Sequence, residues 1–260
     1  MENMTSDRNL YWDLRKSSYP EIDRLPLMES PGPMLVILTA YLAFVLRVGP
    51  AFMRKRQPYK LTTTMLVYNA LQVAISAYLV QMFFKNIHEY GVTPKKCLMT
   101  NDYSRKDVIT SLWIYFIAKI TELADTVFIV LRKKDRQVTF LHMYHHTILV
   151  IGGWGIVKYW PTNALMFAGF LNSLVHVVMY TYYGLASLGP NVTKYLTWKK
   201  YLTTFQLVQF MSVIVQYSTA VFVSDCPPKK SFNIFIVFNA LFFLLLFSHF
   251  YMKTYSKKKE

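Results

Sequence analysis

The sequence predicts an all-α integral membrane protein with seven transmembrane helices. Of its 260 residues, 53% are hydrophobic, and they gather in long blocks separated by short polar connections. A helix needs about 20 mostly apolar residues to cross the hydrocarbon core of a bilayer. A segment in lipid must also satisfy its backbone polar groups internally, which favours helices over an open sheet. Because no soluble domain is apparent, we expect a single membrane domain over residues 1–260.

Seven apolar blocks have the length that a membrane helix requires. They are residues 33–50, 61–84, 109–131, 138–158, 162–184, 201–224 and 232–252. Pro33 and Pro161 stand near the starts of two blocks, where proline is tolerated because the first N–H groups of a helix have no partner within it. The longest polar stretch, residues 1–32, lacks the short apolar core of a cleavable signal peptide.

The charge pattern predicts the orientation of the chain. The net charge of +15 does not require a nucleic acid partner, because the basic residues lie mainly between the apolar blocks. Runs of Lys and Arg follow the first, third and seventh blocks directly, within residues 54–60, 132–136 and 253–259. Short basic segments at helix ends tend to face the cytosol. We therefore expect a lumenal N-terminus (1–32) and a cytosolic tail (253–260).

The two cysteines and the tail indicate the compartment. Cys97 and Cys226 both fall in connections that this orientation places in the lumen, which is oxidising. We expect a Cys97–Cys226 disulfide, with two unrelated thiols as the alternative. Asn3 of "NMT" is a possible glycosylation acceptor on the same side. The ending "KKKE" resembles the dilysine signal that retains membrane proteins in the endoplasmic reticulum; a solvated basic tail is the alternative.

The third block contains ionisable residues in the segment "KITELADT". Such groups cost about 2.5–3.5 kcal/mol each at the centre of a membrane helix, so they usually mark function. Lys119, Glu122 and position 126 share one helical face. Lys119 and Glu122 should therefore form an inward-pointing ion pair at the i, i+3 spacing. For Glu122 and Asp125, a purely structural role in orienting the bundle is the alternative.

The next three blocks also carry polar stripes. In "LHMYHHT", His142, His145 and His146 lie within about 100° of one helix face. The fifth and sixth blocks each place four polar side chains on one face: Asn172, His176, Tyr180 and Tyr183, and then Lys199, Thr203, Gln206 and Gln209. We expect the four stripes to converge on an interior cavity. His88 and His249 are isolated, and we expect structural roles for them.

Two kinds of chemistry use histidines at this spacing. The first is metal binding, because membrane di-iron oxygenases and desaturases carry HxxHH boxes. A di-iron centre built mainly from imidazoles needs more histidines than the six in this chain, but a single metal ion remains an alternative. The second is covalent catalysis, in which a neutral imidazole attacks an acyl thioester and leaves again readily. Neighbouring histidines can then set its tautomer and transfer protons.

Two classes of membrane protein that do no covalent chemistry also have the predicted architecture. A seven-helix receptor would share the orientation, but it would leave the intramembrane histidines without a use. A transporter could use a polar tunnel and proton-binding histidines.

Four segments together resemble a known family. "KITELADT", "QVTFLHMYHHT", "NSLVHVVMYTYY" and "TFQLVQF" are similar, in order and spacing, to the signature boxes of the very-long-chain fatty acid elongases, the ELO-type 3-ketoacyl-CoA synthases. The resemblance covers nearly the whole chain, and the third segment is closest to the animal group. It implies a six-helix barrel around a substrate tunnel, built by spans 2–7 as two inverted three-helix units, with span 1 outside.

The resemblance also implies a reaction. An acyl-CoA condenses with malonyl-CoA, giving a 3-oxoacyl-CoA two carbons longer, CO2 and free CoA. The family points to His145 as the acyl carrier and to His176 as its partner near the reacting carbons. His142 and His146 would orient groups and transfer protons, and Asn172 would donate a hydrogen bond to a developing oxyanion. No redox cofactor or metal is implied. A reductase and a dehydratase must act on the product.

A further set of residues matches positions that line the CoA channel in the family. They are Lys119, Arg132, Lys134, Gln137, His142, Tyr182, Lys199, Thr203, Gln206 and Lys253. Lys253 stands where close relatives have arginine, so it keeps the charge but not the bidentate binding of phosphate. The basic residues that steer the anionic CoA would face the cytosol.

Overall fold

The computed structural model describes residues 16–93, 99, 101–224 and 229–256. These residues form helices and connecting segments, with no strand among them. The positions of the expected disulfide (Cys97 and Cys226), of Asn3 and of the dilysine-like tail all lie outside the described residues, so these three expectations stay predictions.

The helices belong to two compact units, which are described one at a time. The first unit comprises the described part of Met1–Pro58 together with Leu112–Pro161. Its main helices are α1 (Gly32–Ala43), α2 (Gly49–Met53), the end of α4 (Asp102–Thr121), α5 (Ala124–Leu131) and α6 (Phe140–Tyr159). A π-helical turn, η3 (Phe44–Val48), joins α1 to α2, and short 3-10 turns lie at Ile22–Arg24 and Asp135–Gln137.

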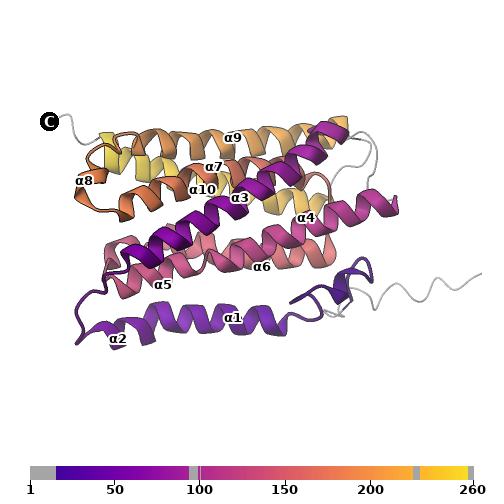
Figure 1. Ribbon diagram of the computed structural model, residues 1–260. Coiled ribbons are helices and arrows are strands. Elements are labelled where there is room, and N and C mark those ends of the chain that lie inside the picture. The colour runs from indigo at the N-terminus through magenta and orange to yellow at the C-terminus, as the bar shows by residue number, and fades with distance from the viewer. Residues whose placement is uncertain (1–15, 94–98, 100, 225–228, 257–260) are drawn as a thin grey trace, which may run out of the picture. The chain divides into compact units, whose positions relative to one another are not determined.

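The second unit comprises Tyr59–Ser111 and the described part of Thr162–Glu260. It contains α3 (Thr62–Tyr90), the start of α4, α7 (Leu165–Ser187), α8 (Pro190–Thr193), α9 (Lys199–Val223), α10 (Lys230–Tyr251) and the π-helical turn η6 (Met252–Ser256). Within this unit α3 packs against α7, α7 against α9, and α9 against α10 (Figure 1).

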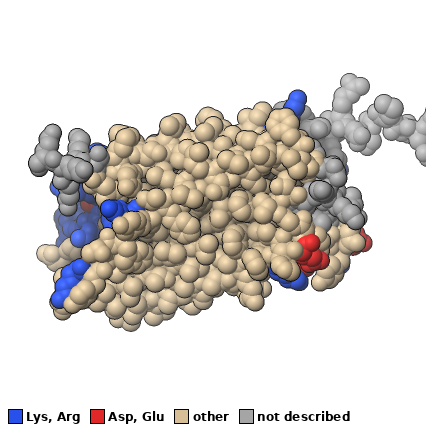
Figure 2. Space-filling model, turned by 90° about the horizontal axis from the view of Figure 1, so that it is seen from above, with Lys and Arg blue, Asp and Glu red and all other residues tan. Residues whose placement is uncertain are grey.

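Five helices are long and apolar enough to cross a membrane. They are Gly32–Met53, Thr62–Tyr90, Leu165–Ser187, Lys199–Val223 and Lys230–Tyr255. They coincide with five of the seven apolar blocks. On the face drawn in Figure 2, few charged side chains interrupt the long uncharged surface. The prediction of an all-helical protein that crosses the membrane several times is therefore confirmed.

The other two predicted spans carry the segments "KITELADT" and "LHMYHHT". The sequence predicts one span over 109–131, but the structure divides it into α4 and α5 at a turn formed by Glu122 and Leu123. α4 also carries charged residues in its first turns, and the three histidines lower the mean hydropathy of α6. Seven spans, the barrel and the inverted repeat therefore stay predictions.

The contact between α3 and α7 depends on a glycine. A Cβ atom on Gly169 of α7 would lie 2.7 Å from two carbons of the Phe83 ring on α3. Phe83 is fully buried, so the aromatic ring occupies the space that a larger residue at position 169 would need. On the neighbouring pair, Phe210 of α9 stacks on Phe243 of α10 with ring centroids 5.6 Å apart.

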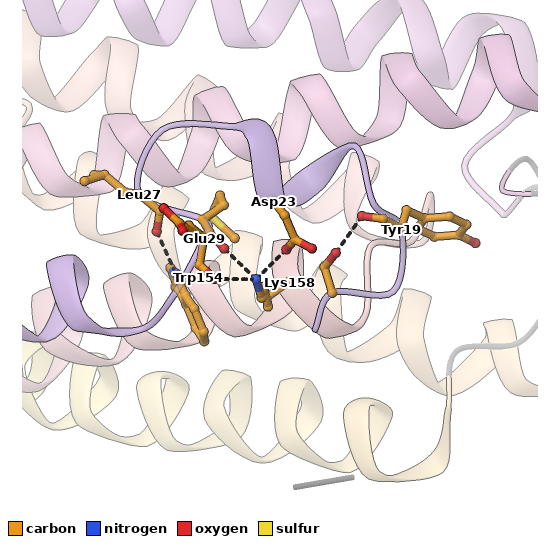
Figure 3. A network of polar contacts seen from close by, with 8 residues as sticks. Tyr19, Asp23, Leu27, Glu29, Trp154 and Lys158 are labelled. Atoms are coloured by element: carbon orange, nitrogen blue, oxygen red, sulfur yellow. Dashed lines mark hydrogen bonds and ion pairs between the residues drawn. The ribbon is translucent and has the colours of Figure 1, made fainter. Parts of the chain in front are cut away.

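In the first unit, the segment before α1 folds onto the C-terminal end of α6 (Figure 3). The Nζ atom of Lys158 lies 2.5 Å from Oδ1 of Asp23 and 2.6 Å from the carbonyl oxygen of Met28. Trp154, one turn earlier on α6, donates its indole N–H to the carbonyl of Leu27 at 2.9 Å. Leu27 adopts a positive φ of 67°, a conformation that turns the chain back sharply. The sequence analysis assigned no structure to this segment.

Candidate active site

The predicted ion pair is present at the junction of α4 and α5. The Nζ atom of Lys119 lies 2.7 Å from Oε1 of Glu122, and both side chains are 3% exposed. The ammonium group also lies 4.7 Å from the centroid of the Tyr115 ring, one helical turn earlier. The i, i+3 spacing thus gives the contact that the sequence predicts. Asp125, on the first turn of α5, is half-buried.

The three histidines of α6 are brought together by one helical turn. The helix begins after Thr139, whose side-chain oxygen accepts a hydrogen bond from the backbone N–H of His142. The ring centroids of His142 and His146 are 4.5 Å apart, and those of His145 and His146 are 5.2 Å apart. His146 is buried, while His142 and His145 are partly exposed. His146 therefore contacts both of the other two imidazoles.

A chain of hydroxyl groups extends from His142 to α1. The Oγ1 atom of Thr126 on α5 lies 2.8 Å from Nε2 of His142. The hydroxyl oxygen of Tyr41 on α1 lies 2.8 Å from the same Oγ1 atom. The sequence analysis placed position 126 on the polar face but missed Tyr41. A single tyrosine in an apolar block gives no periodic signal, so only the packing of α1 in this unit shows its partner.

The second unit holds the other two predicted catalytic residues. Asn172, His176 and Tyr180 are buried at successive turns of α7. The Nδ1 atom of His176 lies 2.7 Å from the backbone carbonyl oxygen of Asn172. Because a carbonyl oxygen only accepts, Nδ1 carries a proton and donates it to this oxygen. Tyr183, the fourth member of the predicted stripe, is exposed.

The candidate CoA-binding residues of the first unit lie near the end of α5. Arg132 caps that helix and is half-buried, and Lys134 and Gln137 follow it at exposed positions. Between them Lys133 has a positive φ of 53°, which reverses the chain. These residues and the buried Lys119 belong to the same unit as His142.

The candidate CoA-binding residues of the second unit lie on α7, on α9 and beyond α10. Tyr182 packs edge-on against Trp198 at a centroid distance of 5.1 Å. At the start of α9, Lys199 is exposed, Thr203 is buried and Gln206 is half-buried, while Lys253 is exposed in the π-helical turn η6.

The structure adds a polar stripe that the sequence analysis missed. Asn69, Gln72 and Ser76 are buried along α3. Their i, i+3, i+7 spacing was visible in the apolar block 61–84, but amide and hydroxyl side chains stand out less than ionisable ones. α3 packs against α7, so this stripe belongs to the helix pair that carries Asn172 and His176.

Metal binding was the first alternative for the histidines. Within the part of the chain that the structure describes, no group of three or more His, Cys, Asp and Glu side chains is arranged to hold a metal ion.

Sequence similarity to known proteins shows the family to which the chain belongs. Residues 26–260 match the ELO (GNS1/SUR4) family. The chain is 40% identical over 247 residues to very long chain fatty acid elongase 7 of Rattus norvegicus, covering 93% of this chain and 87% of that protein. It is 39% identical over 256 residues to very long chain fatty acid elongase 1 of Homo sapiens, covering 97% and 91%. For very long chain fatty acid elongase 7 of Drosophila melanogaster the identity is 41% over 249 residues, covering 93% and 74%. The chain therefore belongs to the ELO family and is an enzyme of the fatty acid elongase type.

Proposed function

We propose that this enzyme catalyses the condensing step of very-long-chain fatty acid elongation. An acyl-CoA and malonyl-CoA react to a 3-oxoacyl-CoA that is two carbons longer, with release of CO2 and CoA. Membership of the elongase family supports this reaction. The observation that carries it is the triplet of adjoining imidazoles on one turn of α6, at ring-centroid distances of 4.5 and 5.2 Å.

In the first half of the proposed reaction, a ring nitrogen of His145 attacks the thioester carbon of the acyl-CoA. An N–C bond forms, the C–S bond breaks, and the CoA thiolate leaves. The proton on the attacking ring passes through His146 or His142 to the thiolate, so that free CoA is the first product. The acyl group remains on His145 as an acyl-imidazole, which is reactive enough to be transferred again.

In the second half, malonyl-CoA occupies the site left by CoA. Loss of its carboxylate as CO2 leaves an enolate, whose carbon attacks the acyl carbonyl of the acyl-imidazole. A C–C bond forms and the C–N bond to His145 breaks, and a proton taken up from water restores the neutral imidazole. The side-chain amide of Asn172 donates to the developing oxyanion. His176 acts as the partner of His145 near the reacting carbons, and its ring is held by the contact of Nδ1 with the carbonyl of Asn172.

The proposal also covers the binding of the substrates and the location of the enzyme in the cell. CoA binds from the cytosol through the ten candidate residues described above, and the acyl chain runs toward the lumen in a tunnel formed by spans 2–7. The protein lies in the endoplasmic reticulum membrane with a lumenal N-terminus and a cytosolic C-terminus. No redox cofactor or metal ion takes part, and other enzymes of the elongation cycle act on the product.

The test uses purified full-length protein in lipid nanodiscs, an acyl-CoA series and malonyl-CoA labelled at its free carboxyl carbon. We expect labelled CO2 and an unlabelled 3-oxoacyl-CoA in equal amounts. An absence of both products across the series would contradict the proposal. Bound iron together with an oxygen-dependent product would instead support the oxygenase alternative.

A further inference from the structure

We propose that Tyr41 on α1 is a positioning residue for His142 and acts through the hydroxyl group of Thr126. The inference rests on the proposed function insofar as His142 assists His145. It gives a role in the site to a helix for which the sequence shows no polar stripe and which the family resemblance places outside the barrel.

The three groups form a continuous chain within the first unit. The Tyr41 hydroxyl and Thr126 Oγ1 are 2.8 Å apart, and Thr126 Oγ1 and His142 Nε2 are also 2.8 Å apart. Thr126 is fully buried and Tyr41 is 6% exposed, so these hydroxyl groups have little access to water. A buried hydroxyl without a partner is destabilising, because nothing replaces the hydrogen bonds that it would make to water. Each group therefore holds the other two in place.

The chain suits both tautomers of a neutral imidazole. If Nε2 of His142 is unprotonated, Tyr41 donates to Thr126 and Thr126 donates to Nε2. If Nε2 carries the proton, it donates to Thr126, Thr126 donates to Tyr41, and the tyrosine hydroxyl points to Sδ of Met143, which lies 3.5 Å away. Within the hydroxyl chain only rotations about two C–O bonds separate these states, while the ring loses its proton at Nδ1 and gains one at Nε2. His142 can therefore change tautomer without leaving its place.

This arrangement assigns different tasks to the two nitrogens of His142. Nε2 is held by the hydroxyl chain, so proton transfer at the site falls to Nδ1. The ring is also 4.5 Å from that of His146, centroid to centroid, which in turn contacts His145. A change at Tyr41 would thus reach His145 through a series of contacts, and it would do so without touching the substrate.

The test compares four single variants and one double variant of the full-length protein. Tyr41→Phe removes one hydroxyl from the chain, and Thr126→Val removes the hydroxyl that bridges the two neighbours. Thr126→Ser keeps that hydroxyl. Tyr217→Phe is the matched control, since Tyr217 is fully buried on α9 and its hydroxyl has no hydrogen-bond partner among the described residues.

We expect Tyr41→Phe to lower kcat by about two- to tenfold with an unchanged KM for acyl-CoA, as loss of one neutral hydrogen bond would. Thr126→Val should lower kcat at least as much, and Thr126→Ser should retain it. The double variant Tyr41→Phe/Thr126→Val should equal Thr126→Val, because Tyr41 acts only through Thr126. Multiplicative losses in the double variant, or equal rates for Tyr41→Phe and Tyr217→Phe, would overturn the proposal.

A second readout does not depend on activity. In protein with ¹⁵N-labelled histidine rings, the signals of His142 are identified by their loss in His142→Gln. Tyr41→Phe should shift the Nε2 signal of His142, and Tyr217→Phe should leave it in place. If the wild-type protein forms no condensation product, the proposed function fails. The His142 signals still decide whether the hydrogen-bonded series from Tyr41 through Thr126 to His142 exists. Unchanged His142 signals in Tyr41→Phe would refute it.

Discussion

The ammonium group of Lys158 on α6 is fully enclosed and lies 2.5 Å from the carboxylate of Asp23, which is 135 residues away in the chain. The carbonyl oxygens of Met28 and Glu29 accept from the same nitrogen at 2.6 and 3.1 Å. The three N–H groups of the lysine thus meet three acceptors, all of them in the segment before α1. This lysine therefore fastens the N-terminal segment to α6.

We predict that Asp23→Asn destabilises the protein and loosens this segment. The change leaves an enclosed ammonium without its counter-charge, which costs about 3–5 kcal/mol in fully buried pairs and less here, because Asp23 is 38% exposed. The measurements are thermal unfolding and limited proteolysis between residues 17 and 31. Asp107→Asn is the control, because Asp107 is 39% exposed but its partner Lys85 is 64% exposed at 3.8 Å. If Asp23→Asn and Asp107→Asn lose equal stability and are cleaved equally fast, burial of Lys158 does not contribute to the stability of this contact.

A second prediction concerns the pair Lys119–Glu122. Glu122→Gln leaves the buried ammonium of Lys119 beside a neutral amide, so the free energy of unfolding should fall by about 3–5 kcal/mol. The double variant Lys119→Met/Glu122→Met should be more stable than Glu122→Gln, because it buries no charge. Chemical denaturation in detergent measures both. A double variant less stable than Glu122→Gln would show that specific contacts outweigh the cost of burying the charges.

A third prediction tests the acyl carrier. Incubation with acyl-CoA alone should attach a hydroxylamine-sensitive acyl group to the protein. One CoA should be released for each protein molecule that is acylated. His145→Ala should lose this adduct, whereas His88→Ala, at an exposed position of α3, should keep it. Mass spectrometry of the intact protein measures the adduct. An undiminished acyl adduct in His145→Ala would move the nucleophile to another residue.

The fourth prediction follows from the contact between Gly169 and Phe83. Gly169→Ala should lower the free energy of unfolding by about 1–3 kcal/mol, since the added methyl group overlaps the ring. Phe83→Leu should partly restore stability in the Gly169→Ala background. Gly155→Ala on α6 is the control, because a Cβ atom there meets nothing within 4 Å and alanine favours a helix. Thermal unfolding should show a loss of stability in Gly169→Ala and none in Gly155→Ala. Equal stability of these two variants would contradict the prediction.

A fifth prediction tests the orientation through the cysteines. A Cys97–Cys226 disulfide should make the unfolded protein run faster on a gel without reductant than with it. Cys97→Ser should abolish that difference. Detection of both thiols in free form in protein prepared without reductant would remove the disulfide and weaken the lumenal assignment of both connections.

The contacts that the sequence predicted are those set by local spacing. Three or four residues along a helix bring side chains to the same face, so the pair Lys119–Glu122 and the proximity of His142 to His146 follow directly from the sequence. Of the seven membrane helices that the apolar blocks predicted, five are long and apolar enough in the structure to span a membrane.

The contacts that the sequence did not predict join distant parts of the chain. Tyr41 and Thr126 are 85 residues apart, and nothing in the first apolar block indicates that its tyrosine points toward the histidine helix. Lys158 could be placed at a helix end by its position but could not be paired with Asp23. Hydrophobic periodicity predicts which face of a helix is buried. It does not predict which other segment of the chain packs against that face.

The turn between α4 and α5 sets the rotational phase of α5. Leu123 and Asp125 donate their backbone N–H groups three residues back, to Ile120 and Glu122, in place of the four-residue bonds of an α-helix. Inserting or deleting one residue between Glu122 and Thr126 would turn the threonine by about 100° around the helix axis. The hydroxyl would then leave His142, although every functional group would still be present. The number of residues in this turn is therefore as constrained as their chemistry.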